Sequence, residues 1–364
     1  RRGAVVALQP KTGEVLAMVS QPSFDPNLFV TGISFKAYGA LRDSIDRPLF
    51  NRVLRGLYPP GSTIKPMMAV AGLDAGVVTE NSRVFDPGFF QLPNVKHKYR
   101  NWNRGGDGWV DLETAIMRSN DTYFYDLAHK MGIDRMHDYM SRFGLGQRVA
   151  LDMFEETAGL MPSRDWKRGR YRQAWYPGET VILGIGQGYM QTTPLQLAQA
   201  TALMATHGKW IRPHLAKSIE GEIPVDPEPM PDIQLRDPDY WDASINGMVK
   251  VLHGARGTAK KVGDTAAYLI AGKSGTAQVV AIKQGEKYDS GKLAERHRDH
   301  ALFVAFAPVH DPQIAVAVMV ENGESGSGVA APVAKQVMDA WLLNEAGELK
   351  AEYAPPLTAE RPKP

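Results

Sequence analysis

The chain has 364 residues and carries 42 Lys and Arg against 40 Asp and Glu, so its net charge is +2 with histidine neutral. This balance gives no reason to expect a nucleic-acid or acidic-lipid partner, because such partners require clustered positive charge. The hydrophobic fraction of 43% excludes wholesale disorder, and the length suits one large domain or two ordinary ones. Without a single cysteine, the chain can have no disulfide scaffold, thiolate metal site or cysteine nucleophile.

The sequence contains no run of about 18 apolar residues, so we expect no membrane-spanning segment in it. The apolar run that follows Arg1 and Arg2 covers only residues 4–8, which is too short for the core of a signal peptide. We therefore expect a mature domain, or a domain cut from a longer protein.

The N-terminal segment predicts a β-hairpin. Residues 4–8 and 14–19 are strand-like, and the turn between them contains Pro10 and Gly13. A Pro-Pro-Gly break at 59–61 then precedes an apolar segment, MMAVAGL, which predicts a buried helix.

The middle of the chain is predicted to be helical. The pattern runs over 112–144 with interruptions at 120–121 and at Gly132. The sequence Thr-Pro-Leu-Gln at 193–196 is typical of a helix start, with Thr as the N-cap and Gln reaching back. Another helix is expected over 241–253, after a surface connection rich in proline and acids.

The C-terminal part returns to strands. Strand-like runs occupy 268–280, 301–308 and 313–320, and the charged stretch 283–300 between the first two is expected to be a mobile loop. A helix near 333–343 follows. Strands at both ends and helices in the middle predict an α+β fold, in which one antiparallel sheet and a helical lobe enclose a cleft.

Ser62 and Lys65 are the first candidate catalytic pair. They lie three residues apart at a predicted helix start, so they share a face of the helix. A neutral amine there can accept the hydroxyl proton, and the positive helix end favours the developing oxyanion. Ser-x-x-Lys also occurs by chance about once in a chain of this length, so the pair alone decides little.

Lys273, Ser274, Gly275 and Thr276 form a second candidate motif inside a predicted strand. Glycine weakens a strand unless something must approach the backbone closely, and a substrate lying along the strand would do so. The similar Lys-Thr-Gly at 11–13 falls in the hairpin turn, where these are ordinary turn residues, and we reject it.

Ser119, Asn120 and Asp121 lie at a break between helical segments. Taken alone, such residues are ordinary N-caps. The order of the three motifs along the chain changes this interpretation, because together they resemble the active-site signature of penicillin-binding proteins and serine β-lactamases.

The resemblance extends over about residues 1–345 and is most specific for the class B, elongation-type transpeptidases, the penicillin-binding protein 2 group. The similar stretches are YPPGSTIKP at 58–66, FDPG at 85–88, SNDTYFY at 119–125, GIGQGYMQTTPLQLA at 184–198, GKSGTAQV at 272–279 and AERHRDHALFVAFAP at 294–308. It implies a five-stranded antiparallel sheet flanked by helices, a mainly helical lobe, and an active site in the cleft between them. Beyond the resemblance, the Pro- and charge-rich composition of residues 346–364 predicts a disordered tail.

The resemblance also implies a peptidoglycan D,D-transpeptidase that serves cell elongation and rod shape. Ser62 would form an acyl-enzyme with a stem peptide and release D-Ala, with Lys65 as general base. Ser119 would help move protons to the leaving amine, and Lys273 would supply positive potential.

The substrate would be held by the third motif. The side chains of Ser274 and Thr276, beside Gly275, would bind the substrate carboxylate. The backbone N–H groups of Ser62 and Thr276 would form the oxyanion hole. β-Lactams would acylate the same serine.

Asp121 departs from the usual Ser-x-Asn form of the second motif. An ionised Asp cannot donate a hydrogen bond, so it cannot copy the role of Asn directly. It could instead pair with Lys65, which would favour the ammonium, or with Lys273.

No cofactor is expected. Some relatives hold a zinc ion beside the second motif with two Asp, a His and a Cys, but the aligned positions here are Asp86, Asn101, Asp107 and Asn120. Two of these are poor zinc ligands, so we predict no metal site. The glycines at 184–188 lack the strand–turn–helix context of a nucleotide loop.

The resemblance implies a setting on the periplasmic face of the bacterial inner membrane, with an anchor that this chain lacks. It also implies a membrane glycosyltransferase partner of the elongation complex, reached through a missing N-terminal region, and no nucleic acid. Three alternatives remain: a β-lactamase, which would need a base for a deacylating water; a non-catalytic β-lactam sensor; and a scaffold with chance motifs.

Overall fold

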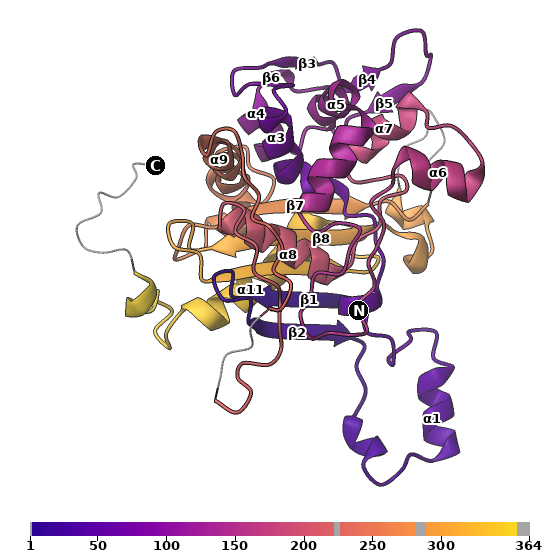
Figure 1. The fold of residues 1–364 in the computed structure, drawn as a ribbon, viewed down its shortest axis with the longest axis vertical. Helices are drawn as coiled ribbons and strands as arrows, with labels where there is room; N and C mark the ends of the chain where they lie inside the picture. Colours follow the sequence, from indigo (N-terminus) through magenta and orange to yellow (C-terminus); the bar gives the residue numbers. More distant parts are fainter. Residues whose placement is uncertain (1, 222–225, 281–288, 355–364) are drawn as a thin grey trace.

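The computed structural model describes residues 2–221, 226–280 and 289–354 of the chain. Its centre is one antiparallel sheet of five strands in the order β2-β1-β9-β8-β7 (Figure 1). The strands are β1 (Gly3–Leu8), β2 (Val15–Gln21), β7 (Ala271–Ala277), β8 (His300–Ala307) and β9 (Ile314–Val320). The predicted sheet, its five members and the α+β class are therefore confirmed.

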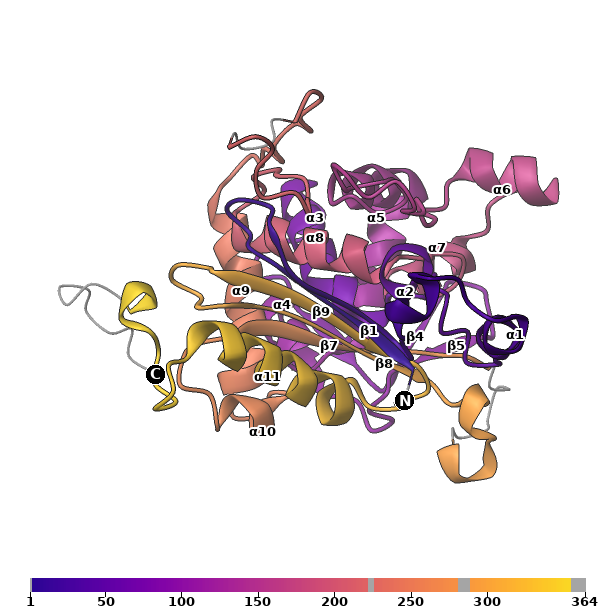
Figure 2. The same ribbon diagram turned by 90° about the horizontal axis from the view of Figure 1, so that it is seen from below.

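Helices cover both faces of the sheet (Figure 2). On one face α8 (Pro194–Ala205) packs on β1, β8 and β9, and on the other α11 (Ala331–Leu342) packs on β8 and β9. Because the central strands are covered on both sides, β8 and β9 read as continuous apolar runs and bury nearly every residue.

Helix α8 begins where its sequence predicts. Thr193 accepts a hydrogen bond from the Gln196 backbone, and the Gln196 side chain accepts one from the Thr193 backbone, which is a complete capping box. Every residue of α8 is buried, including Gln199, whose amide donates to the Ile211 carbonyl. The helix therefore forms the centre of the hydrophobic core.

The helical lobe lies beyond the β7 edge of the sheet, and the N-terminal hairpin forms the opposite edge (Figure 1). The lobe and its borders contain α3 (Lys65–Asp74), α4 (Leu112–Met117), α5 (Asp121–Arg142), α6 (Arg164–Tyr171), α7 (Pro177–Leu183), α9 (Asp239–His253) and α10 (Lys260–Gly263). The predicted helices at 112–144 and 241–253 are confirmed, with breaks at Asn120 and Gly132.

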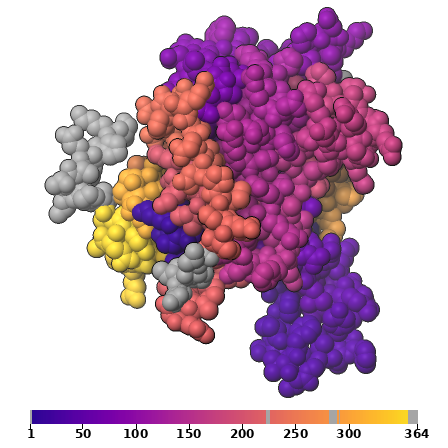
Figure 3. All heavy atoms as spheres, in the orientation of Figure 1, coloured from indigo at the N-terminus to yellow at the C-terminus, as the bar shows by residue number. Residues whose placement is uncertain are grey.

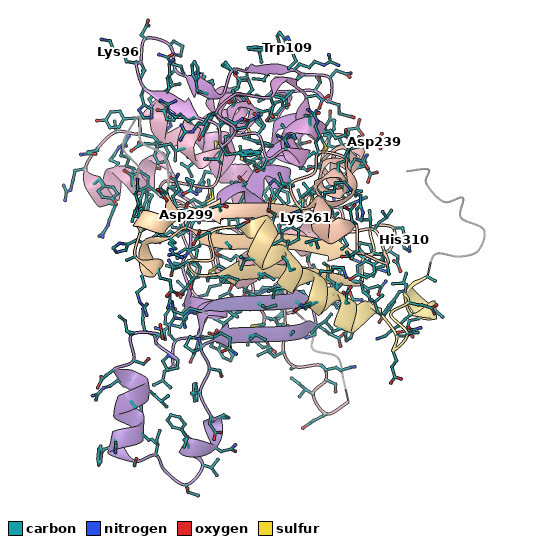
Figure 4. All side chains as sticks on the ribbon, turned by 180° about the vertical axis from the view of Figure 1, so that it is seen from behind. Lys96, Trp109, Asp239, Lys261, Asp299 and His310 are labelled. Carbon is teal, nitrogen blue, oxygen red and sulfur yellow. The ribbon has the colours of Figure 1, made fainter. Side chains whose placement is uncertain are left out.

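Two small sheets at the top of the lobe were not predicted. They pair β3 (Val84–Asp86) with β6 (Gly108–Val110), and β4 (Phe89–Gln91) with β5 (Lys98–Arg100). Strands of three residues are too short to show the alternation on which a strand prediction depends. Trp109 of β6 lies exposed at this end of the molecule (Figure 4).

The segment between β2 and the first motif leaves the body of the molecule as an arm (Figure 3). It contains the turn Pro26–Phe29 and α1 (Phe35–Arg42), and α2 (Arg52–Arg55) follows. The Arg2 side chain pairs with Asp46 and Glu321, at 3.0 Å each, and so ties the base of the arm to the sheet.

Two predicted irregular segments are partly ordered. Of the expected mobile loop at 283–300, residues up to 288 lie outside the described part, while Ser290–Lys292 and Glu295–His297 form 3-10 turns. The tail expected to be disordered from 346 is ordered as far as 354, because Leu349 pairs with Leu343 and the Lys350 backbone donates to Leu342. Residues 355–364 lie outside the described part.

Gly132 interrupts α5 with φ 76° and ψ 161°, a region that is open almost only to glycine. Among the described residues, no atom outside the adjacent helix backbone lies within 4 Å of the position a Cβ would take. Gly132→Ala should therefore lower the free energy of unfolding by about 1–3 kcal/mol through backbone strain alone. Gly169→Ala, at an equally open site within α6, is the control and should be neutral or stabilising by up to about 1 kcal/mol in urea unfolding. Equal midpoints for the two variants would contradict the strain argument.

Candidate active site

Ser62 lies in a 3-10 turn, Gly61–Ile64, that leads directly into α3. The turn packs against the edge strand β7, and a Cβ on Gly61 would lie 2.6 Å from the Thr276 carbonyl oxygen. Gly61 also has φ +56°, so this position needs glycine both for its conformation and for the close approach. The contact brings the first and third motifs to the same floor of the cleft.

The glycines at 184–188 support this turn from the other side. The Gly61 backbone donates a 2.9 Å hydrogen bond to the Gly186 carbonyl, and a Cβ on Gly186 would overlap Gly61. The Gln187 amide donates to the Thr276 carbonyl at 3.2 Å. Gly186 therefore allows the close packing of two backbones.

Lys65 is fully buried at the start of α3, and its amine makes three contacts with the second motif. Nζ lies 2.7 Å from Asp121 Oδ1, 2.9 Å from the Ser119 carbonyl and 3.4 Å from Ser119 Oγ. Of the two pairings open to Asp121, the structure shows the one with Lys65. The other carboxylate oxygen accepts from the Trp102 backbone at 3.0 Å.

Burial is the largest influence on the pKa of this amine. It lowers the pKa of Lys65 below the ordinary lysine value, and the negative charge and hydrogen bond of Asp121 oppose that change without cancelling it. A lysine with a lowered pKa has a larger neutral fraction at a given pH, and only the neutral amine can accept a proton.

Lys273, on β7, is a second fully buried lysine. Its Nζ donates to the Ser274 carbonyl at 2.9 Å. Burial lowers the pKa of Lys273 well below its usual range, the nearby Lys65 lowers it further, and Asp121 acts in the opposite direction. Two buried amines therefore share the field of one carboxylate.

The second motif takes its shape from Ser119 and Asn120. Ser119 has φ 54°, a conformation that is uncommon for a residue with a side chain. The N-cap of α5 is Asn120, whose side chain accepts from the Tyr123 backbone at 2.9 Å. The N-cap interpretation thus applies to Asn120, while Asp121 is free to contact Lys65.

The third motif presents its side chains along the edge of β7. Ser274 Oγ lies 3.0 Å from Thr258 Oγ1, and Thr276 is exposed. A Cβ on Gly275 would lie 2.8 Å from Thr63 Cγ2, so this glycine lets the strand lie directly against the Ser62 turn.

These residues line one cleft of about 840 Å³. Ser62, Ser119, Asp121 and the Ser274–Thr276 edge all face it, while the two lysines lie beneath its surface. Several lining residues were not predicted from the sequence, among them Trp102, Arg104, Arg118, Gln187, Thr258, Gln278 and residues 324–327. Gln187 and Gln278 fall within two of the stretches of resemblance, which assigned them no role, and the others lie outside every motif, on separate segments that only the fold brings together. Asp299, also in the lining, lies directly before β8 (Figure 4).

The four positions aligned with a zinc site in some relatives do not fit a metal ion. The side-chain amides of Asn101 and Asn120 each donate to Asp86 Oδ2 at 2.6 Å, and Asn120 also donates to Asp107 at 3.0 Å. Amide N–H groups point at the carboxylate oxygens that would have to face a cation, so the geometry is one of hydrogen bonds rather than of metal ligands.

In the described part of the chain, no helix is long and apolar enough to cross a membrane.

The chain is similar to the peptidoglycan D,D-transpeptidase MrdA of Acinetobacter baumannii, with 49% identity over 347 residues that make up 94% of this chain and 51% of that protein. It therefore spans about half the length of the curated relatives it matches.

Solved structures are also similar to this chain. The Pseudomonas aeruginosa PBP2 structure in complex with WCK 5153 is 75% identical, with a TM-score of 0.92 over 98% of this chain and 74% of that one. A chain from a peptidoglycan synthase complex that coordinates polymerization and crosslinking is 34% identical, with a TM-score of 0.78 over 93% of this chain and 56% of that one. The family described as the penicillin binding protein transpeptidase domain matches residues 3–339, and the chain belongs to this family.

Proposed function

We propose that this domain is a serine D,D-transpeptidase that cross-links peptidoglycan stem peptides. One observation carries the proposal: three groups of residues that are far apart in the sequence meet at one cleft. They are Ser62, the buried Lys65–Asp121 pair and the Lys273–Thr276 edge. This arrangement contains a nucleophile, a base and an anion-binding edge, which is the set that acyl transfer requires.

Acylation begins at Ser62. Its hydroxyl attacks the carbonyl of the penultimate D-Ala, and the proton passes to neutral Lys65. Backbone N–H groups of Ser62 and Thr276 stabilise the oxyanion of the tetrahedral intermediate, and each such donor is worth about 2.7–4 kcal/mol of barrier. Collapse of the intermediate breaks the peptide bond and leaves an ester on Ser62.

The leaving group is D-Ala, whose amine takes up a proton as it departs. Ser119 lies within 3.4 Å of Lys65 Nζ, so its hydroxyl offers a path for this proton. The D-Ala carboxylate binds Ser274 and Thr276, in the positive potential of Lys273. An amine of a neighbouring stem peptide then attacks the ester, which forms the cross-link and frees Ser62.

The relatives support the wider setting. The similarity to MrdA and to a chain of a peptidoglycan synthase complex supports a role in cell elongation with a glycosyltransferase partner. We place the domain on the periplasmic face of the inner membrane, where its substrate is assembled. β-Lactams, which resemble the D-Ala-D-Ala terminus, would acylate the same serine.

The function predicts that a penicillin adds to Ser62 at one equivalent and stays for many minutes, because the site has a base for acylation but is built for an amine acceptor. Intact-mass spectrometry measures the adduct, and peptide mapping identifies the serine. Ser62→Ala should show no adduct. Rapid return to the unmodified mass would favour a β-lactamase, and no adduct on the parent would refute the proposal. Release of D-Ala from a stem peptide separates an enzyme from a sensor.

Lys65→Ala should slow acylation by about 10²-fold or more, the usual size of a general-base effect. Noncovalent binding of the intact drug should change less, since Lys65 lies beneath the cleft surface. Stopped-flow measurement with a chromogenic cephalosporin separates the dissociation constant of the noncovalent complex from the acylation rate constant. Matching acylation rates for variant and parent across pH 6–9 would show that Lys65 is not the base.

Asp121→Asn tests how the carboxylate tunes Lys65. Asp121 raises the pKa of Lys65 against the effect of burial, so its loss should lower that pKa further. The neutral amine then forms at lower pH, and the limb of acylation that rises with pH should move to lower pH. Asp126→Asn, which breaks a surface pair with Lys130 on the same helix, is the control and should leave the profile in place. Superimposable profiles for Asp121→Asn and the parent would refute the tuning.

A further inference from the structure

Asp86 is a buried carboxylate outside the cleft that no step of the proposed reaction uses. It ends β3 and is 1% exposed, yet it accepts five hydrogen bonds. The donors are the backbone N–H groups of Gly88 and Asp107, the side-chain amides of Asn101 and Asn120, and the Thr122 hydroxyl, at 2.6–2.9 Å.

All five donors are neutral, so the negative charge is held by directed hydrogen bonds rather than by an ion pair. Hydrogen bonds to an ionised acceptor are about twice as strong as neutral ones, and a buried acceptor of this kind is costly to leave unmatched. The donors come from the β3 turn, from the loop before β6 and from the start of α5. One carboxylate therefore joins three segments that meet behind the second motif.

The orientation of both amides is set by their oxygen atoms. Asn101 Oδ1 accepts from the Asp121 backbone at 3.0 Å, and Asn120 Oδ1 accepts from the Tyr123 backbone at 2.9 Å. Each amide nitrogen must then face Asp86. The contacts form a relay from Asp86 through Asn101 to the backbone of Asp121, whose carboxylate holds Lys65 at 2.7 Å.

We propose that Asp86 is a positioning residue, which fixes the start of α5 so that Asp121 holds Lys65 in the geometry needed for acylation. This inference rests on the acyl-transfer function proposed above. Misplacement of a catalytic group by about 1 Å can cost about 10²-fold in rate, so a contact outside the cleft is sufficient to control the reaction.

The test is Asp86→Asn in the whole domain, with acylation by a chromogenic cephalosporin resolved into the binding constant and the acylation rate constant. An amide at this position must turn an N–H group toward donors, since both oxygens of the acid accept. We expect the acylation rate constant to fall by about 10- to 100-fold, with drug binding nearly unchanged. Asn101→Ala, which removes the relay but leaves four of the five contacts of Asp86, should act in the same direction and serves if Asp86→Asn does not fold.

The matched control is Glu156→Gln. Glu156 is a carboxylate that is 2% exposed and accepts backbone hydrogen bonds from Val149 and Ala150, but it lies away from the cleft. This variant should lower the melting temperature and leave the acylation rate constant of the folded protein unchanged. An equal loss of rate in both variants would assign Asp86 to stability alone.

A double-mutant cycle identifies the residue through which Asp86 acts. In an Asp121→Ala background, Asp86→Asn should change the acylation rate constant by less than about 2-fold, because the side chain that Asp86 positions against Lys65 is already absent. Fully additive losses would overturn the proposal, and so would an Asp86→Asn variant that acylates at the parent rate. An absence of acylation in the parent would instead refute the proposed function, so the two failures are distinct.

Discussion

The burial of two lysine amines beside one carboxylate is the constraint on which the rest of the site depends. Lys65 and Lys273 are both fully buried, and Asp121 stands in the field of both. Water would hold both amines protonated, whereas burial favours their neutral forms and their mutual repulsion adds to this. The negative charge of Asp121 offsets part of the free-energy cost of burying the two amines. Because this compensation depends on distance, the segments around Asp121 must be held rigidly.

Close backbone approach provides that stiffness on the sheet side of the cleft. Gly61, Gly186 and Gly275 each occupy a position where a Cβ would press on a neighbouring segment. The turn that carries Ser62 is thereby held between β7 and the loop at 184–188. On the lobe side, the hydrogen bonds around Asp86 hold the start of α5. The cleft thus lies between two packed units, each of which fixes the position of one group of candidate catalytic residues.

The regular elements of the sheet and core could be predicted because each carries its own periodic or capping signal. The paired strands at both ends of the chain and the capping box at Thr193 are examples. The three-residue strands at 84–110 and the arm before residue 50 could not be predicted, because neither is long enough to show a periodic pattern of apolar residues. Residues 346–354 contact the end of α11 through backbone hydrogen bonds, which composition does not reveal.

The sequence by itself determined the candidate catalytic residues: Ser62 with Lys65, Ser119 with Asp121, and the Lys273–Thr276 run, each a short motif with local spacing. Only the tertiary structure decided that Asp121 pairs with Lys65, that Asn120 is the helix cap, and that Trp102 and Thr258 border the cleft. The reason is physical. A motif is a property of neighbours along the chain, whereas burial, pKa and pairing depend on groups that folding brings together from distant segments.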